Sequence, residues 1–102
     1  MVKKITIILG LEEARKSSMV RWSTLFTEVY GGCTVETGIG MYKSIDGGII
    51  EDVSIRYTVY IDERVHSEKE ALDIAKQMCQ HHKQECVLYT IEDVERFRLI
   101  EG

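Results

Sequence analysis

The sequence of 102 residues contains no proline and only one tryptophan. Without proline there is no proline-rich linker, and neither a low-complexity tract nor an internal repeat divides the chain. Glycine, with eight residues in the chain, marks the breaks between predicted elements instead, as at Gly31-Gly32 and Gly47-Gly48. Because the length is close to the commonest domain size, we expect a single domain over residues 1–102.

Positive charge is scarce, with 13 lysines and arginines against 17 aspartates and glutamates and a formal net charge of −4. This balance argues against nucleic acid or an anionic membrane as the main partner. Long apolar runs are also missing: the longest near the start, residues 5–9, is far too short to cross a bilayer and precedes no cleavage site. We therefore expect a cytoplasmic protein with no membrane partner.

Cysteine is limited to Cys33, Cys79 and Cys86. The odd count and the spacing do not form a disulfide framework, so reduced thiols are expected. None of the three lies at the start of a predicted helix, where a thiol would become more acidic. We therefore expect all three to be buried as small apolar side chains rather than to act as nucleophiles.

Alternating apolar and polar residues predict strands at 3–9, 33–42 and 53–62, and a shorter strand at 85–90. The turn signal Asp46-Gly47-Gly48 joins the second and third strands into a hairpin.

A repeat of 3.6 residues predicts a first helix at 19–30, with Trp22 buried against the sheet. A loop that ends in Ser17 or Ser18 precedes this helix, because a serine hydroxyl can cap its first turn. Gly31-Gly32 ends it.

A second helix follows the capping box that runs from Ser67 to Glu70. One stripe of this helix is apolar, formed by Ala71, Ile74, Ala75 and Met78. The tail at 91–102 fits either a short edge strand around Phe97 and Leu99 or a helical turn.

The order β-α-β-β-α-β is that of the ferredoxin-like fold. We therefore predict an α+β, two-layer sandwich in which a four-stranded antiparallel sheet carries two helices on one face, plus a short C-terminal strand or turn. The other sheet face is left open. Alternation places on it Thr34, Glu36, Gly38, Gly40, Tyr42, Ser54, Arg56, Thr58 and Tyr60.

The chain resembles a family of small uncharacterised bacterial and phage proteins, a domain of unknown function. The resemblance covers about residues 5–90 and rests on short motifs: Gly10, Trp22 with Phe26, Thr34-Val35 with Gly38 and Gly40, Gly48 with Ile50 and Glu51, and Gln84-Glu85 with Val87. Tyr42 departs from this pattern, because a tryptophan is more usual there. The resemblance implies the fold, and it implies neither an established activity nor any catalytic residue.

Cys79, His81, His82 and Cys86 have the chemistry of zinc ligands. Their spacing is not that of a zinc finger or ribbon, and neighbouring histidines point about 100° apart on a helix. We therefore expect no bound metal and no cofactor.

Six residues of the open face are the candidate ligand- or partner-binding residues: Glu36, Gly38, Gly40, Tyr42, Arg56 and Tyr60. Gly38-Ile39-Gly40 lies inside a strand, so it indicates close approach of another group rather than a phosphate loop. Glu36, Glu51 and Arg56 are expected near the hairpin's open side, as solvated charges with a cross-strand pair of Glu36 and Arg56 rather than as a paired carboxylate site. The two tyrosines suit a dimer interface better than base stacking.

Three classes of function stay open, and the first is preferred because no convergent nucleophile, base or metal set is visible. The first is a non-enzymatic binding or regulatory protein that acts through self-association, as a dimer, and through its open sheet face, with a protein partner or a small ligand. The second is a small ferredoxin-like enzyme of the dimeric monooxygenase or isomerase type, with a pocket between sheet and helices. The third is a nucleic-acid binder.

Overall fold

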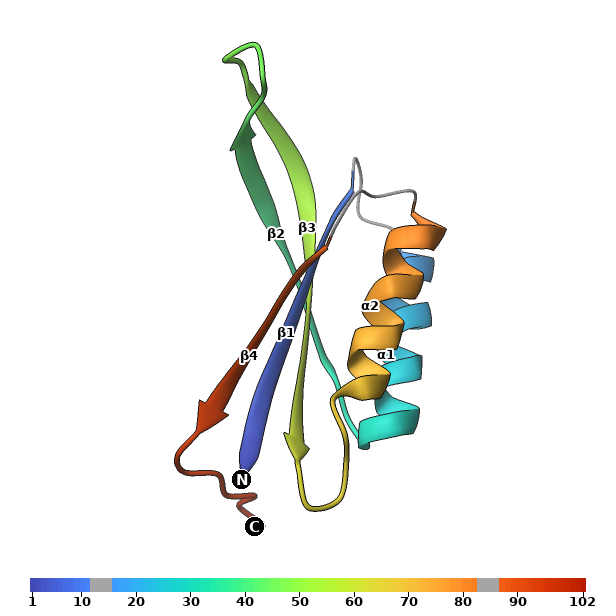
Figure 1. Ribbon diagram of the computed structural model, residues 1–102, viewed down its shortest axis with the longest axis vertical. Coiled ribbons are helices and arrows are strands. Elements are labelled where there is room, and N and C mark those ends of the chain that lie inside the picture. The colour runs from blue at the N-terminus through green and yellow to red at the C-terminus, as the bar shows by residue number, and fades with distance from the viewer. Residues whose placement is uncertain (12–15, 83–86) are drawn as a thin grey trace.

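The computed structural model describes residues 1–11, 16–82 and 87–102, and it contains four strands and two helices (Figure 1). Along the chain these are β1 (Val2–Leu11), α1 (Lys16–Tyr30), β2 (Thr34–Lys43), β3 (Ile49–Asp62), α2 (Lys69–His81) and β4 (Leu88–Val94). The predicted β-α-β-β-α-β order is confirmed.

The sheet has the strand order β2-β3-β1-β4, and all neighbouring strands are antiparallel. Both helices lie on the same side of this sheet (Figure 1). The fold is therefore the predicted ferredoxin-like α+β sandwich, with one sheet face covered by helices and the other left open.

The core lies between the helices and the two central strands. Alternate residues of β1 and β3 point toward the helices, and the apolar stripes of α1 and α2 pack onto them. Trp22 is 1% exposed, as predicted. The buried apolar residues are Ile5, Ile7, Leu9, Trp22, Phe26, Tyr30, Ile55, Tyr57, Val59, Ile61, Ala71, Ile74, Ala75 and Met78.

The first helix begins at Lys16, earlier than predicted. Ser17 and Ser18 are therefore inside the helix, and the prediction that one of them caps it is wrong. Ser18 is instead buried, and its backbone oxygen accepts a hydrogen bond of 3.1 Å from the hydroxyl of Tyr57 on β3. The end of α1 agrees with the prediction, because Gly31 follows it with a φ of +87°.

The second helix begins without the predicted reciprocal capping box. The hydroxyl of Ser67 accepts from the backbone nitrogen of Lys69 at 3.1 Å rather than from that of Glu70. The amide of Ala71, in the same first turn, donates to the hydroxyl of Tyr30. A tertiary contact therefore replaces part of the local cap.

Two strands are displaced from their predicted positions. β3 begins at Ile49, four residues before the predicted start, because the turn at Gly47 is followed at once by pairing with β2. β4 covers Leu88–Val94 and so includes the beginning of the expected tail, whereas Glu85 lies outside the described residues. Beyond Val94 the tail forms neither the edge strand nor the helical turn that were expected.

The β2–β3 hairpin extends beyond the ends of the helices (Figure 1). We call residues 39–50 the hairpin arm. Because no helix covers the arm, Ile39, Met41 and Ile49 are exposed on its helix-side face although they continue the core-facing alternation. No helix in the described part of the chain is long and apolar enough to cross a membrane.

Candidate functional site

The open face of the sheet is built from rows of residues that run across the strands. The pairing register places Glu36 of β2 opposite Arg56 of β3, and Ile8 of β1 opposite the same arginine. Because Ile55 and Tyr57 point into the core, Arg56 between them points to the open face. The strand faces are therefore those that the sequence predicts, except that Glu51, expected near the open side, lies on the helix-side face.

Two of these rows have a uniform character. Gly38, Ser54 and Gly10 are paired across β2, β3 and β1, and we call them the small-residue row. Four threonines are paired across the whole sheet, and we call them the threonine row: Thr34, Thr58, Thr6 and Thr90. Between these two rows of short side chains lies a row of longer ones, formed by Glu36, Arg56, Ile8 and Leu88.

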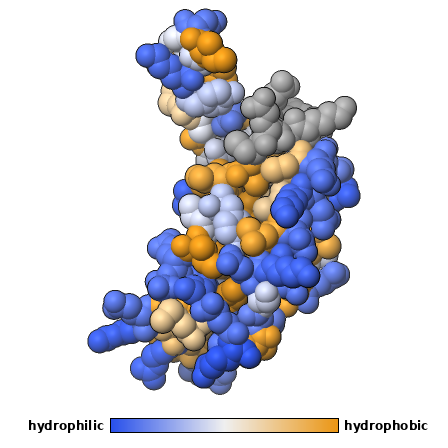
Figure 2. Space-filling view, viewed as in Figure 1, coloured by the Kyte–Doolittle hydropathy of each residue, from blue (hydrophilic) through white to orange (hydrophobic). Residues whose placement is uncertain are grey.

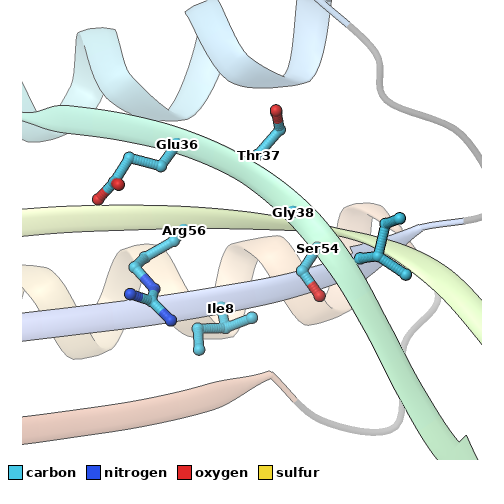
Figure 3. A pocket seen from close by; sticks show the side chains of 7 residues that line it. Ile8, Glu36, Thr37, Gly38, Ser54 and Arg56 are labelled. Atoms are coloured by element: carbon cyan, nitrogen blue, oxygen red, sulfur yellow. The ribbon is translucent and has the colours of Figure 1, made fainter.

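A pocket of about 250 Å³ lies on the open face between the small-residue row and Arg56 (Figure 3). Glu36, Gly38 and Arg56, three of the six predicted site residues, take part in its lining. The complete lining is Ile8, Glu36, Thr37, Gly38, Ile39, Ser54 and Arg56. The pocket therefore combines a carboxylate, a guanidinium and two hydroxyls with the apolar side chains of Ile8 and Ile39.

Glu36 and Arg56 do not form the ion pair that their opposition allows. Figure 3 shows the arginine side chain extending over β1 beside Ile8, whereas the glutamate follows β2. Among the described residues, the ion pairs lie elsewhere, at Lys3 and at Arg64. Both charges of the pocket are therefore available to another molecule.

Asp52 is a residue that the sequence reasoning missed. It faces the open side on β3, opposite Gly40, and a side-chain carbon added at either Gly10 or Gly40 would overlap its carboxylate. The same position at Gly40 is 2.6 Å from the hydroxyl oxygen of Ser54. The two glycines thus give the Asp52 carboxylate room to lie across the sheet next to the pocket. The sequence did offer a signal for Asp52. The alternation that places Ser54 on the open face also places Asp52 there, two residues earlier.

Of the three remaining predicted residues, Gly40 lies opposite Asp52, and Tyr42 and Tyr60 lie far apart on the open face. Tyr42 is 52% exposed and belongs to the hairpin arm, where Figure 2 shows apolar surface near the tip. Tyr60 is 45% exposed at the other end of the sheet, with its ring centroid 5.5 Å from that of Phe97. Tyr60 also lines a separate hollow of about 290 Å³. The six predicted residues therefore share a face, and only three of them share a pocket.

The histidines near the end of α2 contact Trp22 and each other. The indole nitrogen of Trp22 donates a hydrogen bond of 3.0 Å to Nε2 of His82, and the ring of His81 lies 5.6 Å from the indole. The described residues contain no cluster of three metal-binding side chains, and Cys86 lies outside them.

Cys33 and Cys79 are half-buried free thiols. The expectation of full burial is therefore wrong for these two residues, and the expectation for Cys86 concerns a residue outside the described ones. Burial raises the pKa of the Cys33 thiol to about 11. This thiol is neutral near pH 7 and has none of the acidity that a cysteine nucleophile needs.

No family model and no curated protein matches the sequence. Solved structures match the fold. A phage SAM lyase in complex with S-methyl-5'-thioadenosine has a TM-score of 0.69 and 16% identity, over 90% of this chain and 81% of that one. A phage SAM lyase in the apo state has a TM-score of 0.63 and 16% identity, over 88% and 78%.

A third similar structure is a DUF3240 family protein from Shewanella baltica OS155, with a TM-score of 0.56 and 10% identity, over 97% of both chains. At these identities the similarity shows the fold alone. It agrees with the resemblance to small uncharacterised bacterial and phage domains that the sequence motifs indicate.

Proposed function

We propose that this protein is a small non-enzymatic binding protein that self-associates as a dimer through the open face of its sheet. The observation that carries the proposal is the composition of that face. The threonine row and the small-residue row give it two bands of short side chains, and Tyr42 and Tyr60 lie toward its two ends. Sheet faces pack against each other at about 10 Å, and short side chains favour such close approach.

Apolar surface outside the core supports the same conclusion. Ile8 of β1 and Leu88 of β4 are paired on the open face, and Ile50 continues it into the hairpin arm. A sheet face that mixes apolar, hydroxyl and aromatic side chains is typical of an interaction surface. A second copy of the chain is the partner that is always present, and two-fold pairing is the commonest closed symmetry.

The direct test is sedimentation equilibrium at tens of micromolar, with two matched substitutions. Thr34→Arg places a long charged side chain on the exposed edge of the open face, and Thr24→Arg places the same side chain on the exposed surface of α1. We expect a dimer for the native protein and for Thr24→Arg, and weakened association for Thr34→Arg. A native protein that is monomeric at this concentration would refute the proposal.

A second candidate function is enzymatic, acting on an adenosyl sulfur compound. The observation that favours it is the match of 90% of the chain to a phage SAM lyase solved with S-methyl-5'-thioadenosine, together with a pocket that contains Glu36 and Arg56. In this case the open-face pocket holds a ligand, and Glu36 is the group able to accept a proton there.

Calorimetric titration with S-methyl-5'-thioadenosine tests binding, and chromatography after incubation with S-adenosylmethionine tests turnover. If the enzymatic candidate holds, Glu36→Gln abolishes turnover and Glu28→Gln, on the exposed surface of α1, does not. Binding without turnover would support a ligand site in the pocket and would favour the non-enzymatic binding function over the enzymatic one. Neither binding nor turnover would eliminate this candidate.

A further inference from the structure

We infer that Asp52 of one copy forms an ion pair with Arg56 of a second copy across the open face, and that this pairing sets the alignment of the two sheets. The inference rests on the self-association proposed above. It assigns a partner to a carboxylate whose place on the sheet is cleared by Gly10 and Gly40.

The two charges do not pair with each other within one chain. They lie four residues apart on the same face of β3, which separates their α-carbons by about 13 Å. Among the described residues, neither side chain takes part in an ion pair. Arg56 does not pair with Glu36, its cross-strand neighbour, so covering the open face would remove water from two opposite charges that form no ion pair in their own chain, at a substantial cost in free energy.

Ser54 lies midway between Asp52 and Arg56 and belongs to the small-residue row. A two-fold axis that lies in the interface and runs across the strands at this row reverses the direction of β3 in the second copy. Asp52 then faces the partner's Arg56, and Arg56 faces the partner's Asp52. A two-fold interface has this reciprocity by necessity.

The surrounding residues fit the same arrangement. Glu36 faces the partner's Gly40, over which the partner's own Asp52 carboxylate lies, so Arg56 and Glu36 together meet that carboxylate. Gly38, Ser54 and Gly10 lie at the axis, where the two sheets approach most closely. Tyr42 of the hairpin arm lies over the partner's Thr34 in the threonine row, so the arm gains a covered face.

The test is a double-mutant cycle on the dissociation constant for self-association, measured by sedimentation equilibrium. The variants are Asp52→Asn, Arg56→Gln and the double substitution, which nearly preserve side-chain size. Because both sites lie outside the core, we expect each variant to fold, and circular dichroism checks this. Each single variant removes two symmetric ion pairs and is expected to raise the dissociation constant roughly tenfold or more. The double variant is expected to have about the same dissociation constant as the single variant that associates less tightly. The two effects are coupled, because removing either charge already breaks the ion pair.

Glu51→Gln is the matched control, since Glu51 is exposed on the opposite face of the same strand. We expect it to leave the dissociation constant unchanged. Added salt is expected to weaken the native assembly and to have much less effect on the double variant.

The outcomes separate this inference from the function on which it rests. If the native protein stays monomeric, the proposed function and the ion pair are both refuted. A dimer in which the single variants behave like Glu51→Gln, or in which their effects simply add, keeps the proposed function and refutes the pairing. A native trimer refutes the two-fold alignment.

Discussion

Tyr30 at the end of α1 caps the beginning of α2. Its phenolic oxygen accepts a hydrogen bond of 2.9 Å from the backbone nitrogen of Ala71, and its hydroxyl donates one of 2.8 Å to the backbone oxygen of Ser67. A helix start leaves several amides without partners, and a side chain from another element satisfies one of them here. The single hydroxyl therefore connects the two helices that cover the sheet.

Tyr30→Phe is expected to destabilise the fold by about 1–3 kcal/mol, because the buried amide of Ala71 loses its acceptor while the ring packing is kept. The measurement is urea unfolding. Tyr89→Phe is the matched control: the hydroxyl of Tyr89 donates to the carboxylate of Glu68, which water can solvate when the hydroxyl is removed. Equal losses in the two variants would contradict the capping role.

Trp22→Ala is expected to lower the free energy of unfolding by about 3–5 kcal/mol, the usual cost of deleting a core aromatic side chain. Trp22 is 1% exposed, and its indole also bonds to His82. Small domains are stable by only about 5–15 kcal/mol, so the loss would be a large part of the total.

Unfolding of the Trp22 variant is followed by circular dichroism, because the substitution removes the only tryptophan. Val20→Ala, at an exposed position of the same helix, is the control and should change stability by less than about 0.5 kcal/mol. A Trp22 variant as stable as this control would show that the indole is not a core group.

The fold was predictable because the alternation of apolar and polar residues, which separates the two faces of the sheet, recurs in several strands. The alternation around Ile55 and Val35 gives both the strand and its buried side, and the register confirms that assignment. The start of β3 was not predictable in the same way. Glu51 and Asp52 add two acids next to a glycine turn, and only pairing with β2 shows that they belong to the strand.

The candidate site was predictable only in part, because a pocket depends on which strands are neighbours. Glu36, Gly38 and Arg56 belong to one predicted hairpin, so the sequence brings them together. Ile8 and Gly10 come from β1, and their positions follow from the register between β1 and β3. No local sequence pattern predicts the register between β1 and β3. The sequence therefore could not show that Gly10 leaves space for the Asp52 carboxylate.

Cys33 is expected to react slowly with iodoacetamide in the folded protein at pH 8. Burial raises its pKa to about 11, whereas an ordinary thiol titrates near 8.5. Because the thiolate is the reactive form, alkylation should be about two orders of magnitude slower than in the urea-unfolded chain.

The measurement is the rate of alkylation of the Cys33 peptide, followed by mass spectrometry. As the pH rises from 8 toward 11 the thiolate fraction grows, so the rate in the folded protein should increase roughly tenfold for each pH unit. A rate that is the same in the folded and unfolded chains would contradict the raised pKa.

Tyr42→Glu and Tyr60→Glu test whether the proposed interface extends over the whole open face. In the two-fold alignment, Tyr42 lies over the partner's Thr34 and Tyr60 lies over the turn of the partner's hairpin arm. Each glutamate would bring a charge into a covered surface, and we expect each to raise the dissociation constant for self-association about tenfold.

The two tyrosines are 52% and 45% exposed, so either substitution should change the stability of the dilute monomer by less than about 0.5 kcal/mol. Sedimentation equilibrium measures the association, and thermal unfolding at low concentration measures the monomer. If only Tyr60→Glu weakens association, the contact lies near Phe97, because the ring of Tyr60 packs there. The alignment through Ser54 would then be wrong, since it requires both ends of the face to be covered together.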